Sequence, residues 1–121
     1  MLSQPEPLHR QVAAFLCRQV LSGAIAPGEP VAPVRELAMH LEVNPQVVEK
    51  ALHLLATEGL LPSPATGYIL PADAAARALQ WLRNDFIRTR VPELASRLRQ
   101  LQLTPEELVQ HLLQHPKTDH E

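Results

Sequence analysis

Four polar side chains near the middle of the sequence have the types and the spacing that base recognition in DNA requires. They stand at i, i+3, i+4 and i+7, on one face of a helix: Gln46, Glu49, Lys50 and His53. A glutamine amide can pair with adenine, a lysine can donate to guanine, and a glutamate can accept from cytosine. Val47 beside them can touch a thymine methyl group. The alternative is a solvated helix face with an internal Glu–Lys arrangement, worth a few tenths of a kcal/mol.

The stretch that must position these side chains runs from Pro33 to Gly59. Its apolar residues recur twice at i, i+3, i+4 and i+7, first as Val34, Leu37, Ala38 and Leu41, then as Val48, Ala51, Leu52 and Leu55. Asn44 before Pro45 is a helix start signal, and Gly59 is a stop signal. The pattern predicts two short helices joined by a tight turn at residues 42–44. Such a helix-turn-helix usually places its second helix in the DNA major groove.

The flanking segments predict a further helix and a small hairpin. Leu8 to Ser22 is expected to be helical, with Gly23 just past its end. Val31, flanked by prolines, can form one short edge strand at most. The apolar runs 60–61 and 68–70 surround a loop with prolines and a glycine, which suggests a hairpin that packs on the helices. A hairpin in this place is the wing of a winged helix.

Three helical segments are expected after residue 71. Asp73 is expected to cap the first, whose apolar stripe is Ala75, Leu79, Leu82 and Phe86, with Trp81 offset. Pro92 is expected to end or kink it near residues 90–91, before a segment marked by Leu94, Leu98 and Leu101. Thr104-Pro105-Glu106-Glu107 predicts a capping box for the last helix. Its expected buried side is Leu108, Val109, Leu112 and Leu113.

These C-terminal helices expose more leucine than a segment of this size can cover by itself. A homodimer through these helices would bury the same patch twice. The alternative is that they fold back on the winged domain. We therefore expect two regions, 1–71 as a winged helix-turn-helix and 72–121 as a helical dimerisation or tail region.

Composition limits the class of protein. Hydrophobic residues make up 45% of the 121 residues and aromatic residues 3%, so the core must be aliphatic. No apolar run approaches the ~18 residues of a membrane span, and the N-terminus lacks the apolar core of a signal peptide. The single cysteine, Cys17, fits a reducing cytoplasm. We expect a cytoplasmic protein with no membrane partner.

Catalytic and metal-binding patterns are missing from the sequence. It contains no glycine-rich phosphate loop, no nucleophile elbow and no metal cluster of recognisable spacing. His111 and His115 are spaced i, i+4, but no carboxylate or thiol completes a sensible site with them. We expect no enzyme activity, no cofactor and no metal.

Residues 7–70 resemble the winged helix-turn-helix of GntR-family bacterial transcription regulators. The resemblance rests on LSGAIAPGEPVAPVRELAMHLEVNPQVVEKALHLLATEGLL and on the closing GYIL. The combination of SGxIxPG, VRELAxxLxVNP and LxxEGLL with its spacing is specific. The short helical C-terminus, with LQLTPEELVQHLL, looks like the YtrA subfamily, which has no large effector domain. The resemblance covers nearly the whole chain and implies a dimeric, cytoplasmic, DNA-binding repressor, often encoded beside transporter genes.

The resemblance also implies roles for single residues. Arg35 would contact the phosphate backbone or a base; its alternative is a surface salt bridge with an adjacent glutamate, which contributes little. Asn44 and Gln46 would sit at the tip of the recognition helix, and Lys50 would replace the arginine common at its position. The wing, which reaches for the minor groove, would contain Thr66, Gly67 and Tyr68.

Departures from the family pattern concern the groups that contact DNA. Ala32-Pro33 replaces Pro-Ser, Val47 replaces a threonine that bonds phosphate, and Glu49 stands where some relatives have a base-reading arginine. The wing sequence PSPATGYIL has no positive charge. The first 70 residues carry four basic and six acidic side chains, although DNA-binding domains normally present a basic patch.

The expected fold is mainly α with a small β-hairpin wing, as a winged helix-turn-helix plus a short C-terminal helical dimerisation element. The leading hypothesis is a homodimeric transcription regulator, a repressor by resemblance, that binds double-stranded DNA at a two-fold operator. The alternative is a winged-helix protein that has weakened or lost DNA binding and acts through protein contacts. Any small effector would bind at the dimer interface or between helices.

Overall fold

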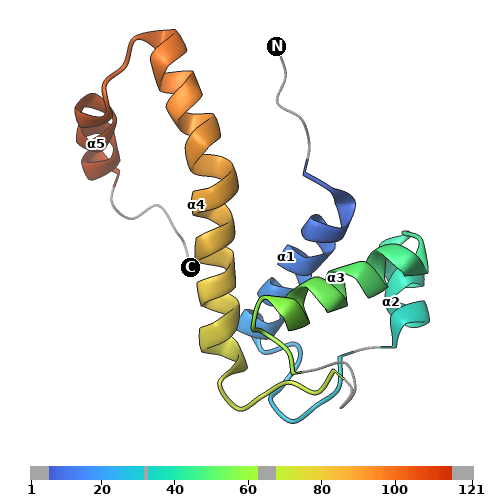
Figure 1. Cartoon of the computed structure of the whole chain (residues 1–121). Coiled ribbons are helices and arrows are strands. Elements are labelled where there is room, and N and C mark those ends of the chain that lie inside the picture. Colours follow the sequence, from blue (N-terminus) through green and yellow to red (C-terminus); the bar gives the residue numbers. More distant parts are fainter. Residues whose placement is uncertain (1–5, 32, 63–67, 116–121) are drawn as a thin grey trace. The chain divides into compact units, whose positions relative to one another are not determined.

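The computed structural model describes residues 6–31, 33–62 and 68–115 (Figure 1). The helices in this part of the chain follow in the order α1 Leu8–Ser22, α2 Val34–Leu41, α3 Pro45–Thr57, α4 Ala74–Leu101 and α5 Pro105–Gln114. The chain divides into two compact units, residues 1–84 and 85–121, so the first turns of α4 are part of the first unit. No helix within the described ranges is long and apolar enough to cross a bilayer.

Helix α1 has the bounds that its apolar spacing predicts. Val12, Leu16 and Val20 are buried on one side, together with Cys17. The helix ends at Gly23, which adopts the left-handed conformation (φ 84°), and the next N–H, of Ala24, donates to the Gln19 carbonyl at 3.0 Å. Glycine reaches this conformation without the steric cost that a Cβ would add.

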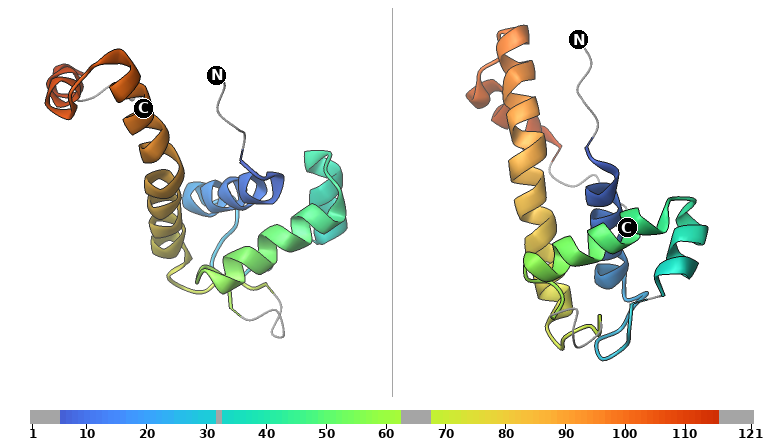
Figure 2. Two further views of the ribbon diagram at one scale, coloured as in Figure 1. Left: turned by 45° about the horizontal axis from the view of Figure 1, so that its top comes forward. Right: turned by 45° about the vertical axis from the view of Figure 1, so that its right-hand side comes forward.

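Helices α2 and α3 confirm the predicted helix-turn-helix. Glu42 turns the chain with a left-handed φ of 59°, and the following Val43 N–H donates to the Ala38 carbonyl at 3.0 Å. Asn44 then caps α3, because its side-chain oxygen accepts from the Gln46 N–H at 2.8 Å. Both views in Figure 2 show α3 lying against α1 and α2.

The first unit is built around an aliphatic core. Its buried side chains come from α1, α2, α3, the first turns of α4 and the segments between them: Val12, Ala13, Leu16, Cys17, Val20, Leu37, Ala38, Val48, Ala51, Leu52, Leu55, Leu60, Leu61, Leu70, Ala74, Ala78 and Trp81. The four residues predicted for the inner face of α3 are all among them. A helix with one apolar stripe is stabilised by this kind of packing rather than by its own propensity.

The predicted hairpin wing is not confirmed by the described residues. Residues 68–70 pair with residues 28–31, where Val31 N donates to the Tyr68 carbonyl at 2.9 Å and Pro30 and Ile69 form an isolated antiparallel bridge. Within the described ranges there is no strand, only this bridge. Leu60 and Leu61 are buried in the core instead, and the expected loop after them lies largely outside the described residues.

Of the two outcomes expected at Pro92, an end or a kink, helix α4 contradicts the end, because the helix continues from Ala74 to Leu101 with Pro92 inside it. An interior proline removes one backbone donor and normally costs about 3 kcal/mol. Pro92 and Arg88 are both exposed, and the Arg88 carbonyl lacks the helical donor that a residue other than proline would supply. Good helix formers on both sides of Pro92, among them arginine, glutamate and leucine, favour continuation.

The buried face of α4 is also different from the expected one. Ala74, Ala78 and Trp81 are buried, whereas Leu79 is 49% and Phe86 57% exposed. This face packs on the core of the first unit, and the indole N–H of Trp81 has a partner there, Glu58. The expected stripe was therefore wrong at Ala75, Leu79 and Phe86, which are exposed, whereas Leu82 is half-buried against the core and Trp81, off the stripe, is buried.

The second unit contains the rest of α4 and helix α5. The predicted capping box is confirmed, since Glu107 N donates to Thr104 Oγ1 at 3.1 Å and Thr104 N donates to Glu107 Oε1 at 2.9 Å. The expected buried side of α5 is not buried in this chain: no residue of α5 is, and Leu112 and Leu113 are 59% and 70% exposed. An amphipathic helix without an apolar neighbour keeps its leucines in water.

Candidate nucleic-acid interface

The outer face of α3 carries the polar set that the sequence predicts. Gln46, Glu49, Lys50 and His53 are all exposed, while the opposite face packs on the core. Among the described residues, neither Glu49 nor Lys50 forms an ion pair. The internal Glu–Lys pair that would have made this an ordinary solvated face is therefore not formed. The face leaves amide, carboxylate and ammonium groups available to a ligand.

Arg35 lies beside this face, one residue into α2. It is exposed, and no ion pair links it to Glu36 or Glu42 within the described part of the chain. Arg35 lines an open hollow of about 780 Å³ along α2, the turn after it and the start of α3, together with Pro33, Val34, Ala38, Met39, Glu42, Val43, Pro45, Gln46 and Glu49. The structure thus brings Arg35, Gln46 and Glu49 to one concave site.

Two of the residues predicted to contact DNA, Asn44 and Val47, also stabilise the fold. Asn44 is exposed, but its side-chain oxygen is used by the cap of α3. Val47 is half-buried and packs against the core, so only part of its side chain faces outward.

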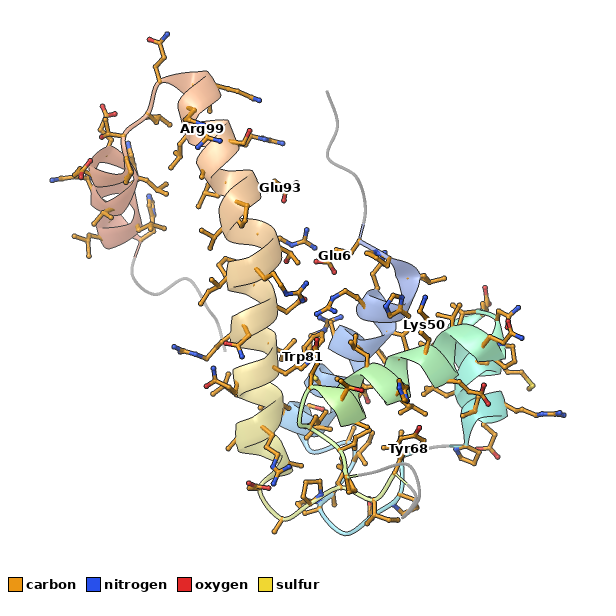
Figure 3. All side chains as sticks on the ribbon, viewed as in Figure 1. Glu6, Lys50, Tyr68, Trp81, Glu93 and Arg99 are labelled. Atoms are coloured by element: carbon orange, nitrogen blue, oxygen red, sulfur yellow. The ribbon has the colours of Figure 1, made fainter. Side chains whose placement is uncertain are left out.

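The predicted wing residues can be placed only in part. Tyr68 is half-buried against the core, and its carbonyl accepts from Val31 (Figure 3). Thr66 and Gly67 lie outside the described residues.

A group of basic side chains that the sequence reasoning missed lies where α1 meets α3; it contains His9, Arg10 and Lys50. Burial lowers the pKa of His9 below its usual 6.5, and the charges of Lys50 and then Arg10 lower it further. The charge of Lys50 therefore acts on the first turn of α1, 41 positions earlier in the chain. No local pattern reveals this pair, because it exists only once α1 packs on α3.

Contacts to Glu58 hold the C-terminal end of α3. The Trp81 indole N–H donates to Glu58 Oε1 at 2.7 Å, and Arg10 Nη2 lies 3.6 Å from the same oxygen. The Arg10 guanidinium also stands over the Trp81 ring, 5.4 Å from its centroid. Nearby, Arg77 Nη1 donates to the Gly59 carbonyl at 2.9 Å.

The described residues contain no group of three His, Cys, Asp or Glu side chains that could hold a metal ion. What the geometry offers is a helix-turn-helix with an exposed polar second helix and a flanking arginine. This arrangement suits hydrogen bonding to base edges from α3 and to phosphate from α2.

Comparison with known proteins finds similarity to bacterial transcription regulators over the first part of the chain. The family model "Bacterial regulatory proteins, gntR family" matches residues 8–63. A curated HTH-type transcriptional regulator of Bacillus subtilis (strain 168), YdeF, is 31% identical over 74 residues; the match spans 60% of this chain and 16% of that protein's length.

Solved structures agree on the fold. A GntR family transcriptional regulator from Listeria monocytogenes superposes with a TM-score of 0.65 and 24% identity, covering 93% of this chain and 98% of that one. YtrA from Sulfolobus acidocaldarius, a GntR-family transcription factor, gives 0.50 and 23%, covering 93% and 90%. The family model therefore relates residues 8–63 to the gntR family, and the two solved structures show that the fold is shared over most of the chain.

Proposed function

We propose that this protein is a DNA-binding transcription regulator that acts as a homodimer on a two-fold operator. The observation that carries the proposal is the site formed by Arg35, Gln46 and Glu49, three exposed polar side chains in one hollow at the tips of α2 and α3. None of them forms an ion pair within the described part of the chain, so Arg35 is available to a phosphate or a base edge, and Gln46 and Glu49 are available to base edges. The GntR family match covers this segment.

The dimer is supported by the distribution of exposed apolar side chains. The second unit exposes eight large ones: Phe86, Ile87, Val91, Leu94, Leu101, Val109, Leu112 and Leu113. Exposed apolar surface of this density is typical of an interface rather than of a monomer's surface. In a two-fold dimer the recognition helices would enter successive major grooves roughly 34 Å apart. The repressor role and the YtrA subfamily are further parts of the proposal, and the support for them is the sequence resemblance of the helical C-terminus.

The test is a gel-shift titration with duplexes selected from a random library, repeated across salt concentrations. We expect a sequence-selective shift. The logarithm of the association constant should fall only slowly with the logarithm of the salt concentration, because few basic side chains would face the DNA. Arg35→Ala should weaken selective binding roughly tenfold, within the ~1–3 kcal/mol of one specific contact. Arg83→Ala, which removes an exposed arginine of α4, is the control and should bind like the wild type. No selective shift at low salt would refute the proposal.

A second candidate is supported by the charges around the hollow. Glu42 and Glu49 line the hollow with Arg35, and the exposed Glu36 follows Arg35 in the sequence, which is an unfavourable setting for phosphate. A winged-helix protein that works through protein contacts would tolerate these carboxylates. In that case Arg35→Ala and Lys50→Ala would leave its function intact, so the same variants separate the two candidates.

A further inference from the structure

The end of α3 opposite to its DNA-facing tip is fixed by contacts from two other helices. Glu58 follows the last residue of α3, and its carboxylate receives the indole N–H of Trp81 from α4 and the guanidinium of Arg10 from α1. The adjacent Gly59 carbonyl receives Arg77, which Asp73 holds in place at 2.8 Å. Side chains from α1 and α4 therefore meet at the carboxylate that follows α3. Figure 3 labels Trp81, the α4 residue of this group.

The two contacts to Glu58, from Arg10 and from Trp81, differ in how strongly they can fix the end of α3. The Glu58 side chain is 38% exposed and its distance to Arg10 is 3.6 Å, so the ion pair alone is weak. The bond from Trp81 is short, charge-assisted and made by a residue that is only 5% exposed. Loss of the carboxylate would leave a buried indole donor unsatisfied, which a rearrangement of α3 against α4 would relieve.

A small rearrangement at this end is amplified at the other end. Gln46 lies twelve residues before Glu58, about 18 Å along the helix, so a tilt of about 5° moves the tip by roughly 1.6 Å. Hydrogen bonds to base edges tolerate only a few tenths of an ångström. Phosphate contacts from flexible side chains tolerate more, because they follow the backbone and carry no sequence information.

We propose that Glu58 is a positioning residue for sequence recognition: through Trp81 and Arg10 it fixes the tilt of α3 and so determines how strictly one DNA sequence is selected. This inference rests on the proposed DNA-binding function. It concerns selectivity, defined as the ratio of affinities for a selected duplex and for a random duplex. Glu58 itself contacts no DNA in this scheme.

The experiment measures both affinities for full-length wild type, Glu58→Ala, Glu58→Gln and Trp81→Phe. Glu58→Ala should lower selectivity between about threefold and thirtyfold, with non-specific affinity changed less than about twofold. Glu58→Gln retains an oxygen for the Trp81 N–H and should recover most of the selectivity. Trp81→Phe keeps the ring but removes the donor, so it should lower selectivity as Glu58→Ala does. Glu106→Ala, which removes an exposed carboxylate of α5, is the control for charge.

The outcomes separate the positioning role from the function on which it rests. If wild type shows no selectivity, the proposed function fails and the positioning role fails with it. If wild type is selective and folded Glu58→Ala and Trp81→Phe are equally selective, only the positioning role is overturned. A purely structural role would lower the melting temperature while leaving the ratio of affinities unchanged. Trp81→Phe keeps the test decisive if Glu58→Ala does not fold.

Discussion

At the scale of single residues, His9 links stability to pH. Its pKa is lowered by burial first and then by Lys50 and Arg10, so the folded protein disfavours the protonated imidazole. The unfolded chain then binds more protons between the lowered pKa and the usual value of 6.5. Stability from this source is complete above about pH 6.5 and is lost as the pH falls through the lowered pKa.

His9→Gln should therefore reduce the loss of unfolding free energy between about pH 7.5 and about pH 5. Urea unfolding followed by far-UV circular dichroism measures this dependence. His111→Gln, at an exposed position of α5, should keep the wild-type dependence. If the His9 and His111 variants lose the same stability on acidification, His9 does not contribute.

Residue positions on α3 were predictable because helical periodicity alone assigns its two faces. The four buried residues and the exposed Gln46, Glu49, Lys50 and His53 follow from the spacing of the apolar side chains. The contacts of Glu58 were not predictable, since Trp81 lies 23 positions later and meets it only through helix packing. The absence of an ion pair at Arg35 among the described residues also needed the structure, because three glutamates stand near it in the sequence.

At the scale of elements, the start of the recognition helix depends on one side chain. Asn44 accepts from the Gln46 N–H at 2.8 Å, which satisfies a backbone donor that has no partner inside α3. Asn44→Ala should lower the free energy of unfolding by about 1 kcal/mol, whereas Asn44→Ser should change it by only a few tenths. Thermal and urea unfolding measure the difference. Equal stability of the alanine and serine variants would show that the cap does not contribute.

Helix bounds were predicted where cap residues are specific, and wrongly where several outcomes compete. Gly23 marked the C-terminal end of α1, because glycine adopts the left-handed conformation there. Asn44 and Thr104 marked the starts of α3 and α5, because their side-chain oxygens accept from backbone N–H groups of the first turn. Pro92 did not end α4, since a proline removes one backbone donor and the helix formers on both sides of it still favour the helix. The prediction of the buried face of α4 was wrong because it followed the large apolar side chains. The structure buries the small Ala74 and Ala78 instead.

At the scale of the whole molecule, the exposed leucines of the second unit predict self-association. Wild type should sediment as a dimer of the 13.5 kDa chain at micromolar concentration. Combined Leu112→Glu and Leu113→Glu should shift it to monomer, since charge would replace side chains that are 59% and 70% exposed in a single chain. The monomer should lose affinity for a two-fold operator but bind one half-site.

A matched substitution outside the second unit keeps this test specific. Leu21→Glu places the same charge on α1, at a position that is 41% exposed, and should leave the dimer intact. Sedimentation equilibrium gives the association constant of each variant. Wild type that stays monomeric at micromolar concentration would contradict the proposed dimer.

Trp81 is the only tryptophan of the chain and lies in the first unit, where it is 5% exposed and bonded to Glu58. Indole emission, excited selectively, therefore reports on the junction of α1, α3 and α4 and is blind to unfolding confined to the second unit. Far-UV circular dichroism reports the helix content of both units. Agreement or separation of the two signals shows whether the halves of this molecule melt together or one after the other.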